Sequence, residues 1–254
     1  MKITILGSGT CFPLVHRSSC SILIENDKSK LLFDIGAGTI RRLTEANKSI
    51  FDISMIFLSH FHPDHSGELV SFLFSSKYAL GVCRDTPFSV IGGKGFIDFY
   101  DRLKNAFGEW IELPNNILQL QEINDKGIDK IFFKDFIIET SSVKHREESI
   151  AYKISVNGKS VVYSGDTDYC QSLIDLAKNC DILISECSLP DDMKIDGHLT
   201  PSLAGKIASE ANVKKLILTH IYPPCDDENL IKSQCGRMYS GKLIIAEDLM
   251  EIYL

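Results

Sequence analysis

Long apolar runs are missing from this sequence. No window approaches the roughly 20 consecutive apolar residues that cross a bilayer, and Met1-Lys2 leads directly into the strand-like segment ITIL instead of the apolar core of a signal peptide. We therefore expect a cytoplasmic protein without a membrane partner. Internal repeats, low-complexity tracts and long linkers rich in proline, glycine or serine are also absent, so residues 1–254 are expected to form a single domain.

Closely spaced cysteine pairs are missing as well. The eight cysteines show no short paired spacing, which disfavours a disulfide framework and predicts reduced thiols. An excess of basic residues is also lacking. The formal net charge of -7 repels nucleic-acid backbones at long range, which is a weak argument against a nucleic-acid substrate. The chain does contain 44% hydrophobic residues, enough for a substantial buried core.

The predicted elements change in rhythm along the chain. Short strands and turns dominate the first half, with strands expected at 3–6, 21–25, 30–35 and 54–59 and helices at 39–47 and 66–80. Asn157-Gly158 predicts a type I′ turn between two strands. Helices and strands then alternate regularly as far as the strand expected at 242–247. This order predicts an α/β fold with two sheets whose outer faces are covered by helices.

The segment FLSHFHPDH, residues 57–65, concentrates imidazoles at the end of an apolar strand. If the chain stays extended there, His60 and His62 point the same way, because side chains alternate along a strand. Pro63 disfavours helical geometry at His62 and can open the following turn. Asp64 and His65 can then reach a second point in space, so one segment can serve two metal ions.

Further imidazoles and carboxylates follow other expected strands. His145 follows SSVK, Asp166 follows VVYSG, and His220 follows KLILT. Scaffolds of the α/β class gather polar side chains at strand ends beside a buried core. Seven ligands are a coherent count for two ions. We expect two divalent ions, with Zn²⁺ preferred because the set is rich in imidazole, and with Mn²⁺ or Fe²⁺ as alternatives.

Taken together, these segments resemble the metallo-β-lactamase fold superfamily and, within it, the ribonuclease Z branch. The matching segments, in the family's order, are GSGTCFPLVHRSSCSILIE, LLFDIGAGTIRRL, FLSHFHPDHSGEL, the lone His145, VVYSGDT, the SEC segment around Glu186, GHLTPSLAGKIA and KLILTHIY. The resemblance implies a four-layer αββα sandwich, with two mixed sheets flanked by helices, as the single domain. It also implies a metal-dependent hydrolase.

The resemblance distributes the metal ligands and the catalytic roles. It assigns the seven ligands to two ions, with His60, His62 and His145 on the first, Asp64, His65 and His220 on the second, and Asp166 bridging both. It makes Asp64, His198 and Glu186 the catalytic residues: His198 would contact the scissile phosphate and help the leaving oxygen depart, and Glu186 would orient it. Asp34 would support the ligand loop without touching metal. Ser185 departs from the family, which more often has a histidine there.

The missing tRNA-binding arm bears on the substrate. In tRNA 3′-processing enzymes of the branch, a long flexible arm is commonly inserted between the third-motif histidine and the bridging aspartate. Here only REESIAYKISVNGKSVVYSG separates His145 from Asp166, and the expected hairpin occupies it. We therefore expect a phosphodiesterase that uses a metal-bridging hydroxide on small or nucleotide-like phosphodiesters, since two ions can activate a shared water and clamp a phosphoester. RNA is not favoured.

Three alternatives remain open. The first is a tRNA 3′-processing endoribonuclease, that is, ribonuclease Z itself. The second is a lactone, ester or thioester hydrolase, which would use the same pair of metals on a carbonyl carbon. The third is a non-catalytic metal-bound scaffold that only binds a ligand, although an intact set of seven ligands argues against it. A homodimer is also left open, because the family often dimerises.

Overall fold

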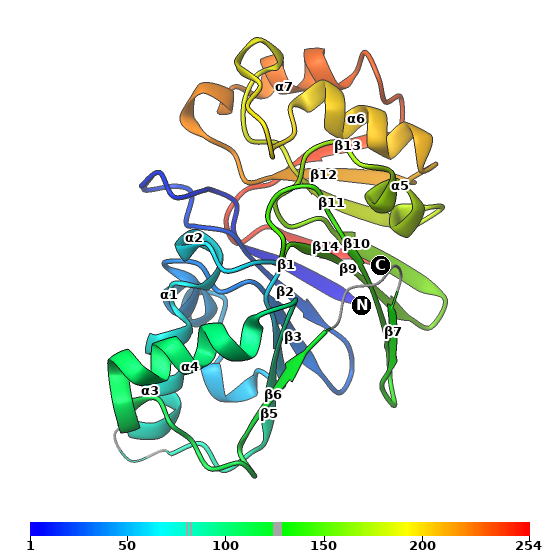
Figure 1. Ribbon diagram of the computed structural model, residues 1–254. Coiled ribbons are helices and arrows are strands. Elements are labelled where there is room, and N and C mark those ends of the chain that lie inside the picture. Colours follow the sequence, from blue (N-terminus) through cyan, green and yellow to red (C-terminus); the bar gives the residue numbers. More distant parts are fainter. Residues whose placement is uncertain (80, 82, 124–128) are drawn as a thin grey trace.

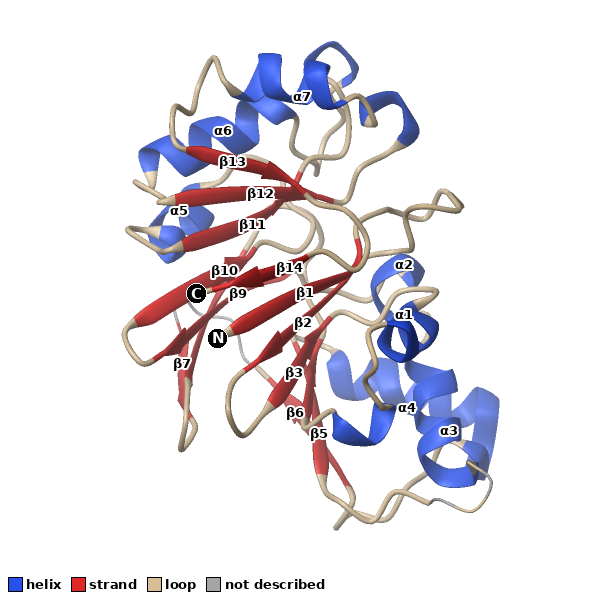
Figure 2. Ribbon diagram, turned by 180° about the vertical axis from the view of Figure 1, so that it is seen from behind, coloured by secondary structure: helices blue, strands red, loops and turns tan. Residues whose placement is uncertain are grey.

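The computed structural model describes residues 1–79, 81, 83–123 and 129–254. Within these ranges, two mixed seven-stranded sheets pack face to face, and helices cover the outer face of each (Figures 1 and 2). The predicted four-layer αββα sandwich is therefore confirmed. No helix of the described ranges combines the length and the apolar character that crossing a membrane would require.

The first sheet comes mainly from the N-terminal half of the chain and has the order β14-β1-β2-β3-β4-β5-β6. Its strands are β1 (Lys2–Gly7), β2 (Ser21–Glu25), β3 (Lys30–Phe33), β4 (Met55–Phe57), β5 (Phe88–Gly92), β6 (Leu118–Glu122) and β14 (Glu251–Tyr253). The helical elements beside it are α1 (Thr39–Glu45), η1 (Ile50–Asp52), α2 (Pro63–Ser66), α3 (Leu69–Tyr78), α4 (Phe96–Phe107) and η2 (Gly108–Trp110). Side chains of α1, α3 and α4 join one buried cluster with its outer face.

The second sheet has the order β13-β12-β11-β10-β9-β8-β7. Its strands are β7 (Asp129–Phe132), β8 (Ile137–Ser142), β9 (Ile150–Val156), β10 (Lys159–Tyr163), β11 (Ile182–Glu186), β12 (Lys215–Thr219) and β13 (Lys242–Ile245). The helical elements on its side are α5 (Gln171–Ala177), η3 (Asp191–Met193), α6 (Pro201–Glu210), η4 (Pro223–Cys225) and α7 (Glu228–Cys235). Helices α5, α6 and α7 cover its outer face (Figure 1).

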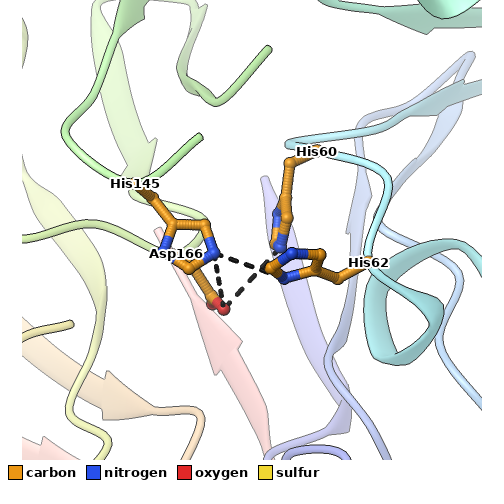
Figure 3. A group of neighbouring side chains, drawn as sticks. All are labelled: His60, His62, His145 and Asp166. Atoms are coloured by element: carbon orange, nitrogen blue, oxygen red, sulfur yellow. Dashed lines mark hydrogen bonds and ion pairs between the residues drawn. The ribbon is translucent and has the colours of Figure 1, made fainter. Parts of the chain in front are cut away.

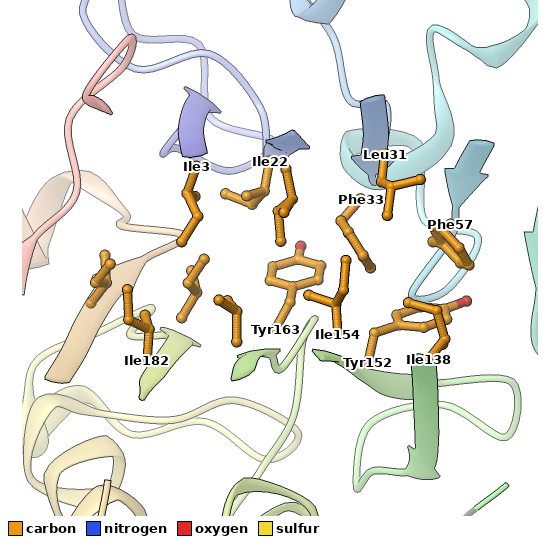
Figure 4. Packing of buried hydrophobic residues seen from close by; sticks show 14 of the residues in the cluster. Ile3, Ile22, Leu31, Phe33, Phe57, Ile138, Tyr152, Ile154, Tyr163 and Ile182 are labelled. Carbon is orange, nitrogen blue, oxygen red and sulfur yellow. The ribbon is translucent and has the colours of Figure 1, made fainter. Parts of the chain in front are cut away.

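The central core lies between the two sheets, where inward-facing residues of both meet (Figure 4). In β2, Ile22 and Ile24 point into this layer, whereas Leu23 packs in the outer layer under the helices. Strands buried on both faces read as continuous apolar runs for this reason. Full burial of each such side chain contributes roughly 1.5–3 kcal/mol, and a slip of one residue would exchange the two faces. The strand ends that carry the site are therefore held in one register.

Most predicted elements are present. Asn157 and Gly158 both have positive φ, 50° and 76°, as the predicted type I′ turn between β9 and β10 requires. Strand β14 was not predicted; its three residues pair antiparallel with β1, with Ile252 opposite Ile3. So short a segment carries too little alternation to be read as a strand. The helix expected at 66–80 corresponds to α3, Leu69–Tyr78. The last residue of the expected range, Leu80, lies outside the described residues.

Candidate metal centre

The segment that follows β4 directs its side chains to two places. His62 keeps an extended backbone, with φ -59° and ψ 147°, and Pro63 starts helix α2. This is the behaviour expected of a residue before proline and of a proline in the first helical turn. The turn of α2 carries Asp64 and His65 to a different point from His60 and His62, as the sequence predicts.

The seven predicted ligands lie together as two groups that share one neighbourhood. The first cluster consists of His60, His62 and His145, and the second cluster of Asp64, His65 and His220. The candidate ligand atoms of the first cluster and Asp166 all lie within 4.8 Å of one another, and so do those of the second cluster. Figure 3 shows the imidazoles of the first cluster converging on the Asp166 carboxylate. Segments far apart in the sequence thus supply the candidate ligands of one site.

Asp166 lies between the two clusters and faces each with a different oxygen. Its Oδ2 lies 3.8 Å from His60 Nε2 and 4.0 Å from His145 Nε2. Its Oδ1 lies 3.1 Å from His65 Nε2 and 3.4 Å from His220 Nε2. A carboxylate placed this way can contact two cations at once, which is the role that the sequence predicts for it.

Two histidines are oriented by an acceptor on the far side of the ring. His65 Nδ1–H donates to Asp34 Oδ2 at 2.7 Å, and His145 Nδ1–H donates to the Gly197 carbonyl at 2.9 Å. Asp34 is fully buried, accepts from the Ser59 amide at 2.7 Å and belongs to neither candidate ligand group, which fits the supporting role expected of it. Such contacts use the Nδ1 hydrogen and turn Nε2 toward the centre, where it can bind a cation.

Serine hydroxyls orient two more histidines. The Nδ1 atoms lie 3.0 Å from hydroxyl oxygens in the pairs His60–Ser59 and His220–Ser188. Each hydroxyl gives its own hydrogen to a buried carboxylate at 2.7 Å, that of Ser59 to Asp34 and that of Ser188 to Glu186. Because the hydroxyl hydrogen is used in this way, the oxygen can only accept from the imidazole. We infer the same Nδ1–H tautomer for all four histidines.

Several buried atoms at the centre have no hydrogen bond of acceptable geometry. Within the described residues, these atoms include His60 Nε2, His65 Nε2, His220 Nε2 and Asp166 Oδ1. A buried polar atom without a partner costs about 1–3 kcal/mol, so proteins rarely contain a group of them. All four atoms face the same small volume, and imidazole nitrogen and carboxylate oxygen are donors that divalent cations accept. The residues present therefore fit a pair of divalent metal ions.

The pKa shifts of Asp166 and His60 agree with this fit. Burial alone would raise the pKa of Asp166, but the charges of His220 and His65 hold the pKa of that carboxyl well below its usual range. Burial and the neighbouring His65 hold the pKa of His60 well below the ordinary value of an imidazole. An ionised carboxylate and a neutral imidazole are the forms that bind a metal. The pKa of His65 moves the other way: burial would lower it, but the charges of Asp166 and Asp34 raise it well above the ordinary value, so a bound cation would displace a proton from Nε2.

His198 lies beside the clusters and is paired with Glu186, as the resemblance predicts. Its Nδ1 lies 3.1 and 3.3 Å from the two Glu186 oxygens and 3.9 Å from Asp166 Oδ2. Burial would lower the pKa of His198, but the hydrogen bond and charge of Glu186 raise it to about 8. Glu186 is itself buried and accepts from the Thr167 amide at 2.6 Å. The departure at Ser185 leaves this pairing intact.

Sequence reasoning missed Ser59, Ser188 and Asp168. The Ser188 hydroxyl contacts three predicted site residues, Glu186, His198 and His220. Each of the three lies within two residues of a predicted site residue in the chain. That proximity was the available signal, but a serine or aspartate beside a ligand is too common to be assigned a role without the fold.

Arg17 contacts none of the seven predicted ligands. It is 7% exposed, pairs with Asp226 at 2.9 Å, and donates to Ser8 Oγ and the Ala246 carbonyl at 2.7 and 2.6 Å. These contacts tie the segment before β2 to the C-terminal part of the chain. A cavity of about 490 Å³ beside Arg17 contains none of the predicted ligands in its wall. Arg17 therefore supports a loop.

Comparison with known proteins extends this description. The family described as "Anti-Pycsar protein Apyc1" matches residues 1–237. The ribonuclease Z of Methanosarcina acetivorans is 24% identical, over 99% of this chain and 97% of its own. The metallo-β-lactamase fold protein YhfI from Bacillus subtilis superposes with a TM-score of 0.84 at 24% identity, covering 99% and 98% of the two chains. The short form of human tRNase Z gives 0.80 at 23%, covering 100% and 99%. The predicted resemblance is confirmed.

Proposed function

We propose that this chain, which belongs to the family of anti-Pycsar protein Apyc1, is a phosphodiesterase acting on small or nucleotide-like phosphodiesters. The premise is that it is a metal-dependent hydrolase of the metallo-β-lactamase fold. The observation that carries the proposal is the position of Asp166 between two imidazole clusters, with His198 3.9 Å from it. We further propose Zn²⁺ as the native ion, because imidazole nitrogen dominates the donor set.

The proposed roles follow from the contacts. The three side chains of each cluster, together with Asp166, would hold a pair of divalent ions, which supply an activated water at neutral pH and neutralise charge on a bound phosphate. His198 has Nδ1 directed at Glu186, which leaves Nε2 for the substrate. A protonated imidazole there can donate its hydrogen to the leaving oxygen. Glu186 holds the ring and favours the protonated form.

The shape of the chain favours small substrates over tRNA. Strands β9 and β10 and their two-residue turn occupy residues 150–163, between His145 and Asp166. That hairpin belongs to the second sheet. All residues between His145 and Asp166 are described, and none of them forms a projecting arm. The negative formal charge of -7 also gives no attraction for an RNA backbone.

Ribonuclease Z activity is the second candidate. It is favoured by the similarity to a protein named ribonuclease Z along 99% of this chain. In that case another surface, or a second copy of the chain, would have to grip the RNA. The two candidates share one metal centre, so only the substrate separates them.

A substrate panel tests the proposal. Purified protein with Zn²⁺ or Mn²⁺ would be assayed on an aryl phosphodiester, cyclic nucleotides, a precursor tRNA and a lactone. We expect turnover of the aryl and nucleotide phosphodiesters and none by Asp166→Ala. Asp181→Ala is the control, because Asp181 is an aspartate beside a strand of the same sheet, is paired with Lys214 and contacts no predicted ligand. Lactone turnover alone, or equal rates for both variants, would overturn the proposal.

A general-acid role for His198 makes a separate prediction about the leaving group. A nitrophenolate departs as an anion near neutral pH, whereas a nucleoside alkoxide needs a proton. His198→Ala should therefore lose far more activity on the nucleotide substrate than on the aryl phosphodiester. Equal losses on the two substrates would contradict proton donation by His198.

A further inference from the structure

The aspartate two residues after Asp166 has no role in the scheme above, yet it is buried and both of its carboxylate oxygens accept hydrogen bonds. Asp168 is 6% exposed. Its Oδ2 accepts from Lys194 Nζ at 3.0 Å and from the Gly197 amide at 3.2 Å, and its Oδ1 accepts from the Tyr169 amide at 2.7 Å. Lys144 Nζ lies 3.7 Å from Oδ2. Two ammonium groups and two amides therefore surround one carboxylate.

Gly197 connects this carboxylate to the first cluster. Its amide donates to Asp168, while its carbonyl accepts from His145 Nδ1–H. Gly197 has a φ of 85°, and a Cβ there would lie 3.0 Å from His145 Nδ1. It also directly precedes His198. The position of this one residue therefore affects both the His145 ring and the start of the segment that carries His198.

A second connection closes a ring of contacts. The Asp168 amide donates to the Lys144 carbonyl at 2.7 Å, and residues 144 and 168 form an isolated antiparallel bridge. Asp168 is thus bonded both to the residue before His145 and to the residue that holds the far side of the His145 ring. The closed circuit of contacts runs from Asp168 through Gly197 and His145 to Lys144 and back to Asp168. Its members cannot move independently.

We propose that Asp168 is a positioning residue that directs His145 Nε2 toward the first cluster and sets His198 beside Asp166. It does so by holding the Gly197 amide and the backbone at residue 144. The statement about His198 rests on the proposed function, whereas the statement about His145 requires only that the centre binds metal. Asp168 itself touches neither cluster in this arrangement. Lys194 fixes the carboxylate and, through the Ile195 carbonyl at 2.6 Å, the loop that follows.

The chain contains a close match to Asp168 away from the centre. Asp181 accepts from Lys214 Nζ and from the Ser160 amide, each at 2.9 Å, and Lys159 Nζ lies 3.9 Å away. The side chains of Asp168 and Asp181 are 8% and 11% exposed. Both are carboxylates held by two lysines and by backbone amides, two for Asp168 and one for Asp181. Only Asp168 is bonded to a residue that orients a predicted ligand.

The test measures metal binding without any substrate. Apo protein would be titrated with Zn²⁺ against a chromogenic chelator. Asp168→Ala is expected to bind one of two equivalents about 10- to 100-fold more weakly, the usual cost of losing a residue that orients a ligand. Asp168→Asn keeps an oxygen for the Gly197 amide and is expected to recover most of that affinity. Asp181→Ala should bind both equivalents like the unaltered protein and lose a similar amount of thermal stability.

The outcomes separate this inference from the proposed function. Wild-type affinity for both equivalents in folded Asp168→Ala would overturn it, as would an equal loss in Asp181→Ala. If Asp168→Ala does not fold, Gly197→Ala disturbs the same connection from its other end and should weaken the same equivalent; unchanged binding there would also overturn it. If the protein hydrolyses no phosphodiester but Asp168→Ala still binds weakly, the proposed function fails and the role of Asp168 toward His145 stands. With an active substrate, kcat should fall with KM little changed.

Discussion

The two clusters of the centre are supported by different kinds of groups. In the second cluster, His65 and His220 are fully buried, and both are held by side chains that are themselves buried, Asp34 and Ser188. In the first cluster, the His145 side chain is 8% exposed and its ring is held by a backbone carbonyl in a loop, that of Gly197. Both histidines of the second cluster are thus held in the core. In the first cluster, His60 is also buried and held through Ser59, but His145 depends on a surface loop.

Backbone conformation shows the same contrast. Asp34 and His220 both adopt the left-handed region, with φ of 59° and 57°. A residue other than glycine costs on the order of 1 kcal/mol or more there, and only firm surroundings keep it in place. These two residues hold or form the second cluster. We infer that the second cluster is preorganised and that the first is the more adjustable half, next to the place where His198 would meet a substrate.

The largest effect is expected when the residue shared by the two clusters is removed. Asp166→Ala deletes the one carboxylate that faces both clusters. Zinc content is expected to fall below one ion per chain, and phosphodiesterase activity by about 10³-fold or more. Elemental analysis of the purified variant and steady-state rates measure the two losses. Retention of two ions at full occupancy would show that Asp166 does not connect the clusters.

Removing Asp34, the buried support of His65 and, through Ser59, of His60, should be the next largest effect. In Asp34→Ala, His65 loses its partner, and the hydroxyl of Tyr163, which donates to Asp34 at 2.5 Å, loses its partner as well. We expect a loss of about 3–5 kcal/mol in the free energy of unfolding, as for other broken buried ion pairs. Urea denaturation measures it.

The matched change for the first cluster is Asp168→Ala, which should cost less stability because its lysine partners are partly exposed. If Asp34→Ala and Asp168→Ala destabilised the protein equally, the distinction between a core-built and a loop-built cluster would be wrong.

These contrasts mark the limit of what sequence could predict. That the seven candidate ligands lie together was predictable, because they follow apolar strands within one short segment or directly at a strand end, as at Asp166 and His220. The fold was predictable from the same strands. The groups that hold the ligands were not, because Gly197 meets His145 and Ser188 meets His220 only after β11, β12 and β8 are aligned in one sheet. Hydroxyl and carbonyl groups are present throughout any chain, so only their spatial placement distinguishes them.

Metal removal tests the contrast between the two clusters without any mutation. If the loop-held cluster is the more adjustable, a chelator is expected to extract its ion first, and release should follow two phases with comparable amplitudes. Stopped-flow absorbance with a chromogenic chelator resolves the phases. Asp168→Ala should accelerate the fast phase and leave the slow one unchanged. A single phase in the unaltered protein would mean that the two clusters release metal as one unit.

The smallest effect is expected at Ser188, which supports the second cluster by a single hydroxyl. Ser188→Ala removes the acceptor of His220 Nδ1–H, but the ring stays packed in the core, where the side chain is 1% exposed. Affinity for the second ion should fall by about 10-fold, at the low end for lost supporting groups. Ser188→Thr, which keeps the hydroxyl, should restore it if the extra methyl group is accommodated. The chelator titration measures both variants. A larger loss than in Asp168→Ala would reverse the assignment of the rigid and the adjustable half.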